Sequence, residues 1–419
     1  MKATSLLLLC SAAITHASPV YQLHEWGTFT TVAGSDGVLL TGLEREEEHL
    51  PPFIHSHLGL ENGQPQDPVE MTRILKLHGT LGFSNPMMKG MGSRPVANVK
   101  VKMETPVIYF HSEEAFHAKV KVGFEGGTIS QWYPQRSGGE TLPEPPPSPD
   151  PMNKPTPRAA WTVDFAKPYR GAIDWDVDVL DPKQTRDLVL FKPSDNLGWI
   201  RTRQPVTNAV RTAKGETEGY LFYRGIGNFD PGLKTTVDAS ETLHLENHSG
   251  GRIPYLVVFE IVGGTLRWTE RVDGLDAKGT LEIPEDGLKA EPNGFSETLY
   301  RSVSTGLAKC GLTEAEARSM VETWWHSYFE SPGLRVFWVL PREKTNQLLP
   351  LEVSPAPTEL VRVLVGRSEV LRPRQEMEWQ KLALKTGDEA YQWNNLVFGD
   401  RFGLAIKERI AALSTQAAK

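Results

Sequence analysis

The chain has 419 residues, of which 39% are hydrophobic and 23% charged, and its formal net charge at pH 7 is −7. This composition is typical of a soluble globular protein, and the length is sufficient for two or three domains with a substantial core. The negative net charge argues against nonspecific binding to nucleic acid or anionic lipid, because both need a basic surface. We therefore expect no nucleic-acid partner.

Residues 1–17 have the pattern of a signal peptide. Lys2 provides the positive charge, Leu6 to Ile14 form a short apolar run, and cleavage is predicted after Ala17. The run is too short to cross a bilayer core of about 30 Å, and no later stretch approaches the roughly 18 apolar residues of a membrane helix. We expect an exported protein, periplasmic or extracellular, without a transmembrane segment.

The number of cysteines agrees with the predicted export. The chain has two cysteines, and Cys10 lies in the predicted leader, so that the mature chain keeps Cys310 alone and has no internal disulfide. An exported protein of this size without disulfides fits a bacterial envelope compartment better than a small disulfide-rich scaffold.

The first predicted strand covers residues 20–32, where threonines and aromatic residues favour a pleated surface. Alternation places Leu23, Glu25 and Phe29 on one face, and His24 and Trp26 on the other. In this register Glu25 lies on the more apolar face. A buried carboxylate must be paired, hydrogen-bonded or protonated, because leaving it charged and alone costs several kcal/mol.

The middle of the chain predicts two β-rich parts separated by a proline-rich segment. Short alternating runs and turn residues indicate antiparallel strands in an N-terminal module, 18–136, and in a second module, 161–300. The proline-dense segment 137–160 has no packed core of its own and is either a linker or a surface insertion. We expect two antiparallel β-sandwich-like modules.

Residues 301–419 predict a mixed α/β C-terminal part. Thr313 and Glu316 form a T-x-x-E capping box that starts a helix, and Ser331-Pro332-Gly333 ends it. LRVFWVLP and VRVLVGRSEVL then read as buried strands, and EMEWQKLAL and RFGLAIKERIAAL as closing helices. The fold class expected for the whole chain is mostly β with a mixed α/β C-terminal part.

Three stretches carry a resemblance to other proteins: HEWGTFTTVAGSDG, METPVIYF, and GLRVFWVLPR with the LPLEVSPAPTELVRVLVGRSEVL that follows. On these stretches the chain resembles a group of exported bacterial proteins with an N-terminal HEWGTFT motif. The resemblance covers most of the chain and implies bacterial origin and export. It transfers no activity, cofactor or catalytic residue.

A metal site is the first chemical hypothesis. His55 and His57 form an H-x-H pair, and on a strand two residues two apart share a face, so that both imidazoles can meet one ion. A divalent metal such as zinc needs one or two more ligands. His24 and His49 are the candidates nearby in sequence, with Glu25 as the candidate catalytic residue. The alternative is that these histidines are surface or hydrogen-bonding residues.

The second hypothesis concerns an acidic strand. Asp174, Asp176 and Asp178 share one face of a predicted strand, where they could bind calcium or act as acid and base on a glycoside. The pattern lacks the glycine and distal glutamate of a calcium loop, and a half-exposed strand with an acidic outer face explains it as well.

Two classes of function remain. The first is a metal-dependent hydrolase with a His-rich N-terminal site, acting through an activated water. The alternative is a noncatalytic glycan- or protein-binding or structural envelope protein. In that case some of the eleven tryptophans, among them Trp26, Trp132 and Trp175, would line a surface for a small molecule or glycan. The sequence contains no P-loop, dinucleotide-binding glycine pattern or G-x-S-x-G motif, which disfavours nucleotide and NAD binding.

Overall fold

The computed structural model describes residues 19–45, 50–51, 53–57, 95–142, 162–188, 190, 197–291 and 297–417. The predicted signal peptide, His49 and most of the proline-rich segment lie outside these residues. Strand accounts for 40% of the structure and helix for 26%, and helices gather in the C-terminal part. This confirms a mostly β fold with a mixed α/β C-terminal part.

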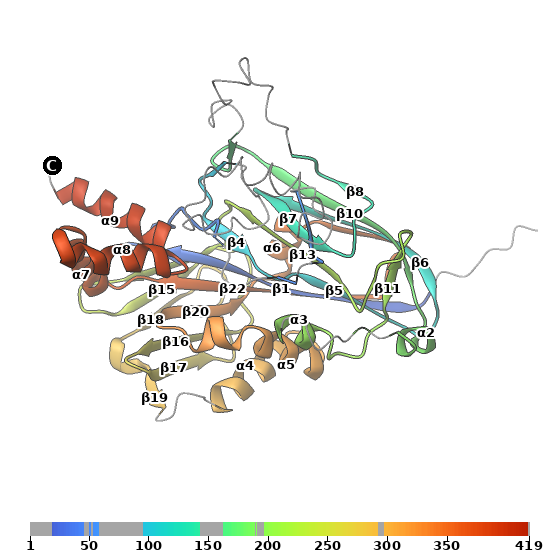
Figure 1. The fold of residues 1–419 in the computed structure, drawn as a ribbon. Coiled ribbons are helices and arrows are strands. Elements are labelled where there is room, and N and C mark those ends of the chain that lie inside the picture. The colour runs from blue at the N-terminus through green and yellow to red at the C-terminus, as the bar shows by residue number, and fades with distance from the viewer. Residues whose placement is uncertain are drawn as a thin grey trace, which may run out of the picture.

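The main sheet runs through the centre of the molecule and contains eleven strands among the described residues (Figure 1). Its order is β19 (Lys289–Glu291), β17 (Thr265–Arg271), β16 (Leu256–Val262), β20 (Gly333–Val339), β22 (Glu359–Val370), β1 (Tyr21–Ala33), β4 (Val101–Met103), β13 (Leu221–Gly227), β7 (Gly127–Tyr133) and β2 (His55–Ser56), while β5 (Val107–Ser112) pairs with both β1 and β13. β1 runs parallel to β22 along nearly its whole length and antiparallel to β5 and β4.

Two of the smaller sheets cover one face of the main sheet. One contains β12 (Thr217–Glu218), β11 (Val210–Thr212), β10 (Arg170–Val179), β6 (Phe116–Glu125) and β21 (Leu351–Ser354), with β8 (Gly138–Gly139) beside β10. Another contains β14 (Leu233–Val237), β15 (Leu243–Asn247) and β18 (Thr280–Ile283), and β3 (Val96–Ala97) pairs with β9 (Val163–Asp164). Leu23 and Phe29 of β1 share one hydrophobic cluster with Val120 of β6 and Trp175 of β10, so the sheets stack face to face.

Helices cover the other face. They are α3 (Leu197–Thr202), α4 (Glu297–Lys309), α5 (Glu314–Thr323) and the π-helical turn η4 (Trp325–Phe329). Trp26 of β1 packs here in a second cluster with Val303 of α4 and Val321 of α5. Because both faces of β1 are covered, nearly all of its residues are buried, as expected for a strand in a parallel pair.

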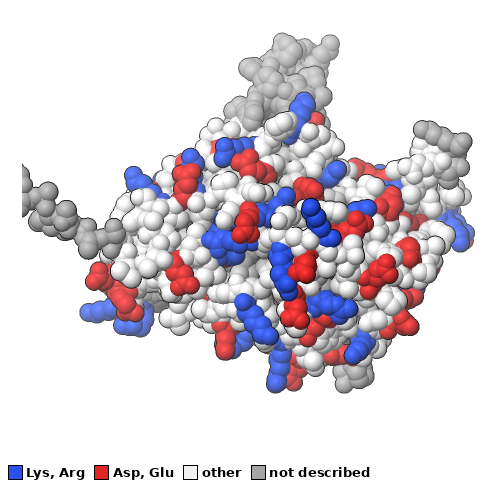
Figure 2. Space-filling model, turned by 180° about the vertical axis from the view of Figure 1, so that it is seen from behind, with Lys and Arg blue, Asp and Glu red and all other residues white. Residues whose placement is uncertain are grey.

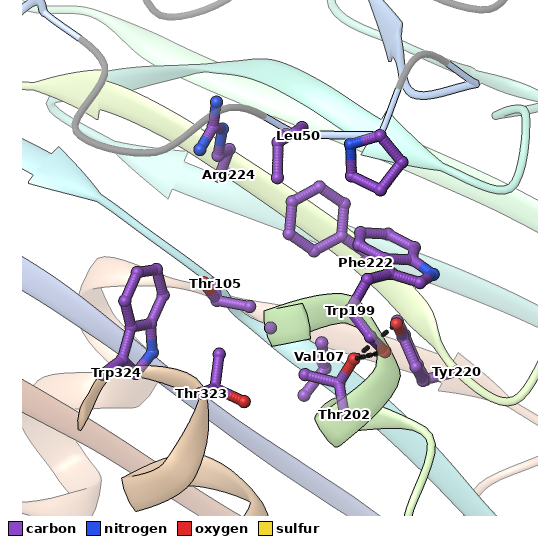
Figure 3. A pocket seen from close by; sticks show the side chains of 12 residues that line it. Leu50, Thr105, Val107, Trp199, Thr202, Tyr220, Phe222, Arg224, Thr323 and Trp324 are labelled. Carbon is purple, nitrogen blue, oxygen red and sulfur yellow. Dashed lines mark hydrogen bonds between the residues drawn. The ribbon is translucent and has the colours of Figure 1, made fainter. Parts of the chain in front are cut away.

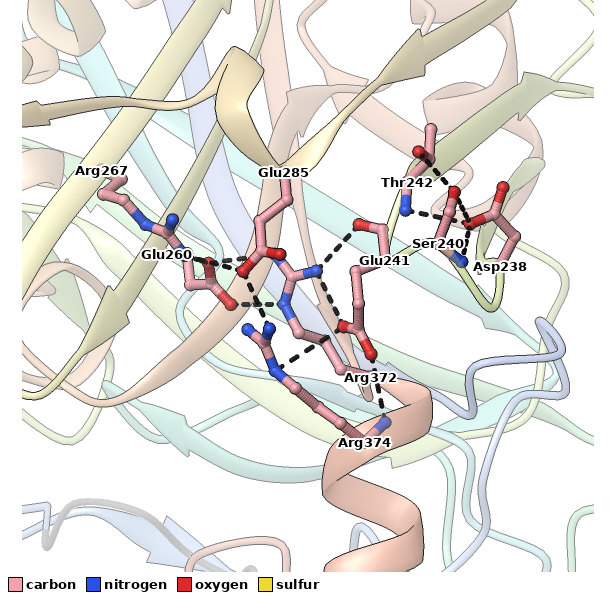
Figure 4. Close-up of polar contacts among 9 residues, drawn as sticks. All are labelled: Asp238, Ser240, Glu241, Thr242, Glu260, Arg267, Glu285, Arg372 and Arg374. Atoms are coloured by element: carbon pink, nitrogen blue, oxygen red, sulfur yellow. Dashed lines mark hydrogen bonds and ion pairs between the residues drawn. The ribbon is translucent and has the colours of Figure 1, made fainter.

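The remaining helices are α2 (Pro182–Arg186), α6 (Arg342–Leu348), α7 (Pro373–Ala383), α8 (Ala390–Gly399) and α9 (Gly403–Ala417), with short 3-10 turns η3 (Glu285–Gly287) and η5 (Gly387–Glu389). The last three helices gather at one end of the main sheet (Figure 1). Arg372, just before α7, donates to Glu260 of β16 and to Glu241 between β14 and β15, and Arg374 pairs with Glu285 of η3 (Figure 4). This network of charges ties the C-terminal helices to two sheets.

Strands from all three predicted parts of the chain meet in the main sheet: β1, β4, β5 and β7 from the first, β13, β16 and β17 from the second, and β20 and β22 from the third. The main sheet is therefore built from all three parts of the chain. A long-range parallel pair such as β1 with β22 leaves no mark in local alternation, which is why the pattern could not show it.

On the face opposite to that of Figure 1, acidic and basic side chains are interspersed (Figure 2). Such mixing is typical of a surface with many ion pairs. Within the described part of the chain, none of the helices has the length and apolar character needed to cross a membrane.

Candidate metal centre

Two histidines come together on the helix-facing side of the main sheet. His24 of β1 lies opposite Tyr109 of β5, and His111 lies two residues further along β5, opposite Gln22. Side chains two residues apart on a strand share a face, so His24 and His111 are diagonal neighbours. Their ring centroids are 4.7 Å apart. Both strand positions follow from the β1–β5 register.

The third group is Glu316, in the first turn of α5. His24 Nδ1 lies 3.0 Å from Glu316 Oε2 and 3.1 Å from Oε1, and His111 Nε2 lies 3.1 Å from Oε1. The capping box fixes the carboxylate, because the Thr313 backbone N–H donates to Oε2 at 2.8 Å and the Thr313 hydroxyl accepts from the Glu316 N–H at 3.2 Å. The predicted capping box is thus confirmed, and the same carboxylate also faces the two imidazoles.

Burial and charge define the state of this cluster. The Glu316 side chain is fully buried, His24 is buried, and the His111 side chain is 23% exposed. Burial raises the pKa of Glu316, but hydrogen bonds from His111 and His24 and the nearby charge of His24 outweigh it and hold the pKa at about 2. Glu316 is therefore an ionised carboxylate at neutral pH.

A buried tyrosine closes one side of the cluster. Tyr109, the direct neighbour of His24 across the strands, is fully buried, and its hydroxyl donates to the Thr202 carbonyl at 2.7 Å. Of the three side chains, His111 is the most exposed, at 23%, compared with 7% for His24 and 0% for Glu316.

The three groups can hold a metal ion. His24, His111 and Glu316 each offer one ligand atom, and these atoms lie within 4.8 Å of one another. Tetrahedral zinc with bonds of about 2.0–2.2 Å places its ligand atoms roughly 3.3 Å apart. Two nitrogens and one carboxylate oxygen leave a fourth position open. Among the residues that the structure describes, this is the one set of three His, Cys, Asp or Glu side chains that converges in this way.

His24 is thus the predicted ligand that the structure brings into a cluster. His55 instead places Nε2 2.9 Å from Glu216 Oε1, and its ring stacks against Tyr133. His57 Nε2 donates to the Ile129 carbonyl, and its ring packs edge-on to Trp132. The two imidazoles of the H-x-H pair therefore have different partners, and neither converges with His24.

Glu25 lies on the opposite side of β1, as predicted, within the apolar cluster between the sheets. It is 3% exposed, accepts a hydrogen bond from the Tyr223 hydroxyl at 2.6 Å, and pairs with the Arg362 guanidinium of β22. The expectation that a buried Glu25 must be paired is confirmed. Its carboxylate is engaged in this ion pair, away from His24.

The acidic strand is β10, and His117 of β6 lies between two of its carboxylates. His117 Nε2 is 2.7 Å from Asp176 and Nδ1 is 2.9 Å from Asp178, and all three side chains are more than 40% exposed. Because each carboxylate meets a different ring nitrogen, no single nitrogen converges with both. Asp174 lies further along the same face, beside Gly138.

The sequence patterns do not single out His111 or Glu316 as candidate ligands. His111 ends the predicted strand METPVIYFH, and Glu316 was recognised through its capping role alone. A signal existed in principle, since an antiparallel pairing of residues 21–26 with 107–112 places His24 and His111 on one face. Nothing local indicates that pairing or the helix that covers it.

A small apolar cavity lies between α3, α5 and the main sheet (Figure 3). Trp199, Phe222 and Trp324 line it, and the Thr202 hydroxyl donates to the Trp199 carbonyl and contacts the Tyr220 hydroxyl at its edge. Its volume of about 30 Å³ is far below the roughly 300 Å³ at which small-molecule sites begin. This cavity is therefore too small for an organic ligand.

Comparison with known proteins identifies no family. No family model matches the chain, and no curated protein matches it. Eleven chains of solved structures match, among them the Fcho1 Mu homology domain of Danio rerio with bound Eps15 peptide. That match has 8% identity, covers 85% of this chain and 98% of the other, and has a TM-score of 0.29, which is too low to support any argument.

Proposed function

We propose that the protein is a metal-dependent hydrolase that binds one divalent ion of the zinc class through His24, His111 and Glu316. The observation that carries the proposal is the convergence of two imidazole nitrogens and one ionised, buried carboxylate within 4.8 Å. Two histidines with one glutamate are a ligand set of catalytic zinc sites, which leave the fourth position to water.

The chain's own residues would divide the work. β1 and β5 hold the two imidazoles at diagonal positions, because the two strands are paired on both sides of these residues, from Tyr21 opposite Ser112 to Trp26 opposite Val107. The capping box of α5 holds the carboxylate, so the ligands are oriented before an ion arrives. The partial exposure of His111 provides the route for water and substrate. The bound ion would lower the pKa of its water and so supply a nucleophile at neutral pH.

Ion binding competes with direct hydrogen bonds in this cluster. In the metal-free form, the ring nitrogens of His24 and His111 donate to Glu316, whereas ligation requires the same nitrogens without their protons. Binding should therefore release protons and weaken as the pH falls.

Titration of chelator-treated mature protein with Zn²⁺ by isothermal calorimetry, together with elemental analysis, tests the metal site. We expect one Zn²⁺ per chain, and a loss of at least about tenfold in affinity for His24→Ala, His111→Ala and Glu316→Gln. His117→Ala is the matched control. His117 also contacts two carboxylates, but Asp176 contacts its Nε2 and Asp178 its Nδ1, so the two carboxylates do not converge on one nitrogen. An unaltered Zn²⁺ affinity in the three variants, or no stoichiometric metal, would refute the proposal.

Hydrolysis has its own test. We expect the protein to cleave at least one of three classes of chromogenic substrate: phosphates, carboxylic esters and amides. Chelator should abolish this cleavage, and added Zn²⁺ should restore it. If Zn²⁺ binds but none of the three substrate classes is cleaved, the site is a metal-binding site without the proposed activity.

We also propose export to the periplasm or the extracellular space, on the pattern of residues 1–17. N-terminal sequencing of the secreted protein should then find Ser18 as the first residue. A mature chain that still begins at Met1 would contradict this.

A further inference from the structure

A cavity of about 560 Å³ lies between one face of α4 and strand β17, apart from the metal centre. The helix contributes Arg301, Ser302, Thr305 and Lys309, and the strand contributes Trp268 and Glu270. A volume of this size is within the range of small-molecule sites, which extends from about 300 to 1,000 Å³.

Packing explains why the cavity exists. The apolar stripe of α4, Leu299, Val303 and Leu307, is buried in the core, so the neighbouring polar face of the helix stands over β17. Gly306 lies directly against the Tyr255 ring, and a Cβ at this position would be 2.6 Å from ring atoms. This close approach fixes the helix at one end of the cavity.

The polar groups of the cavity are held in place. Ser302 donates to the Glu270 carboxylate and lies 3.1 Å from the Tyr255 hydroxyl. The Trp268 indole N–H donates to Glu291 of β19 at 2.8 Å, which fixes the plane of the half-buried ring. The cavity therefore combines an oriented aromatic ring with a connected set of hydroxyl and carboxylate groups.

The charges around the cavity balance. Arg301 forms an ion pair with Glu297 one turn earlier in α4. Lys309 and Glu270 then contribute one charge of each sign to the lining. A ligand with a strong net charge of either sign gains little from such a lining, whereas a neutral molecule rich in hydroxyls can use both donors and acceptors.

We propose that this cavity binds a neutral sugar ring of an oligosaccharide. The C–H face of the sugar would pack on Trp268, and its hydroxyls would exchange hydrogen bonds with Glu270, Ser302 and Thr305. The inference does not depend on the metal site, since none of its residues is a ligand of the proposed ion.

Isothermal calorimetry of the full mature protein with four tetrasaccharides tests the proposal: cellotetraose, maltotetraose, chitotetraose and, as the acidic comparison, tetragalacturonate. We expect at least one of the three neutral sugars to bind with a stoichiometry of one. Thr305→Trp fills the cavity from an exposed helix position and should weaken that binding at least about tenfold, as should Trp268→Ala.

The matched control is Trp379→Ala, because Trp379 is also half-buried but lies on α7. This variant should bind the sugar as the unaltered protein does. Failure of all three neutral sugars to bind would overturn the proposal, and so would binding of tetragalacturonate alone. Binding that Thr305→Trp leaves unchanged would also overturn it, because the sugar would then occupy another place.

Discussion

Removing Arg362 should destabilise the protein strongly, because it leaves Glu25 as an uncompensated charge in the core. Both side chains are almost fully buried, and the guanidinium contacts the Glu25 carboxylate directly. Burial is the largest single influence on the pKa of Arg362 and lowers it, but the negative charge of Glu25, the hydrogen bond to Glu25 and the neighbouring Tyr223 together outweigh burial and raise this pKa. Breaking a buried pair from one side costs about 3–5 kcal/mol.

The expected size of the effect follows from what remains. In Arg362→Met the Tyr223 hydroxyl still donates to Glu25, so one hydrogen bond to the carboxylate survives while the opposite charge is lost. We expect a loss of about 3 kcal/mol in the free energy of unfolding at pH 7. The double variant Glu25→Gln/Arg362→Met should recover a large part of it, since no buried charge is then left alone.

Urea unfolding followed by tryptophan fluorescence measures the effect, with Arg318→Met as the matched control. Arg318 pairs with Glu314 one helical turn away, but both side chains are largely exposed, and such a pair contributes little. If Arg362→Met and Arg318→Met lower the stability equally, or if the double variant is no more stable than Arg362→Met, the reasoning about Glu25 is refuted.

Two further predictions concern α4 and α5. In chelator-treated protein, the lowered pKa of Glu316 means that its ionised form stabilises the fold above about pH 4.5 and that this contribution, about 3 kcal/mol, disappears as the pH falls towards 2. Glu316→Gln should therefore flatten the dependence of the unfolding free energy on pH between 5 and 2, whereas the control Glu314→Gln should retain it. A profile for Glu316→Gln that is parallel to that of the unaltered protein would contradict the assignment. Gly306→Ala should lower the free energy of unfolding, measured by thermal unfolding, by about 1–3 kcal/mol, because the new methyl group meets the Tyr255 ring. The control Gly399→Ala should lower it much less, because the space around Gly399 is open. Equal effects of the two substitutions would show that α4 is not held at this contact.

Part of the candidate site could be predicted. His24 was identified from its position in a polar stretch, and Glu25 was correctly expected to be buried and paired, because alternation along one strand determines which side chains share a face. The partners of Glu25 could not be named, since Arg362 lies 337 residues further along the chain. The H-x-H pair shows the limit of spacing arguments. The two histidines have ligand-like separation in the sequence, yet His55 contacts Glu216 and His57 contacts the Ile129 carbonyl.

The sequence by itself determined what depends on neighbours in the chain: the first strand, the capping box of α5, the acidic outer face of β10 and the strand–helix alternation of the last third. Only the tertiary structure decided how these elements combine. It placed β22 beside β1, β5 on the other side of β1, and α5 across their common face, so that Glu316 meets His24 from 292 residues away. The physical reason is that propensity and capping act over a few residues, whereas strand partners and covering helices are selected by burial of the whole core.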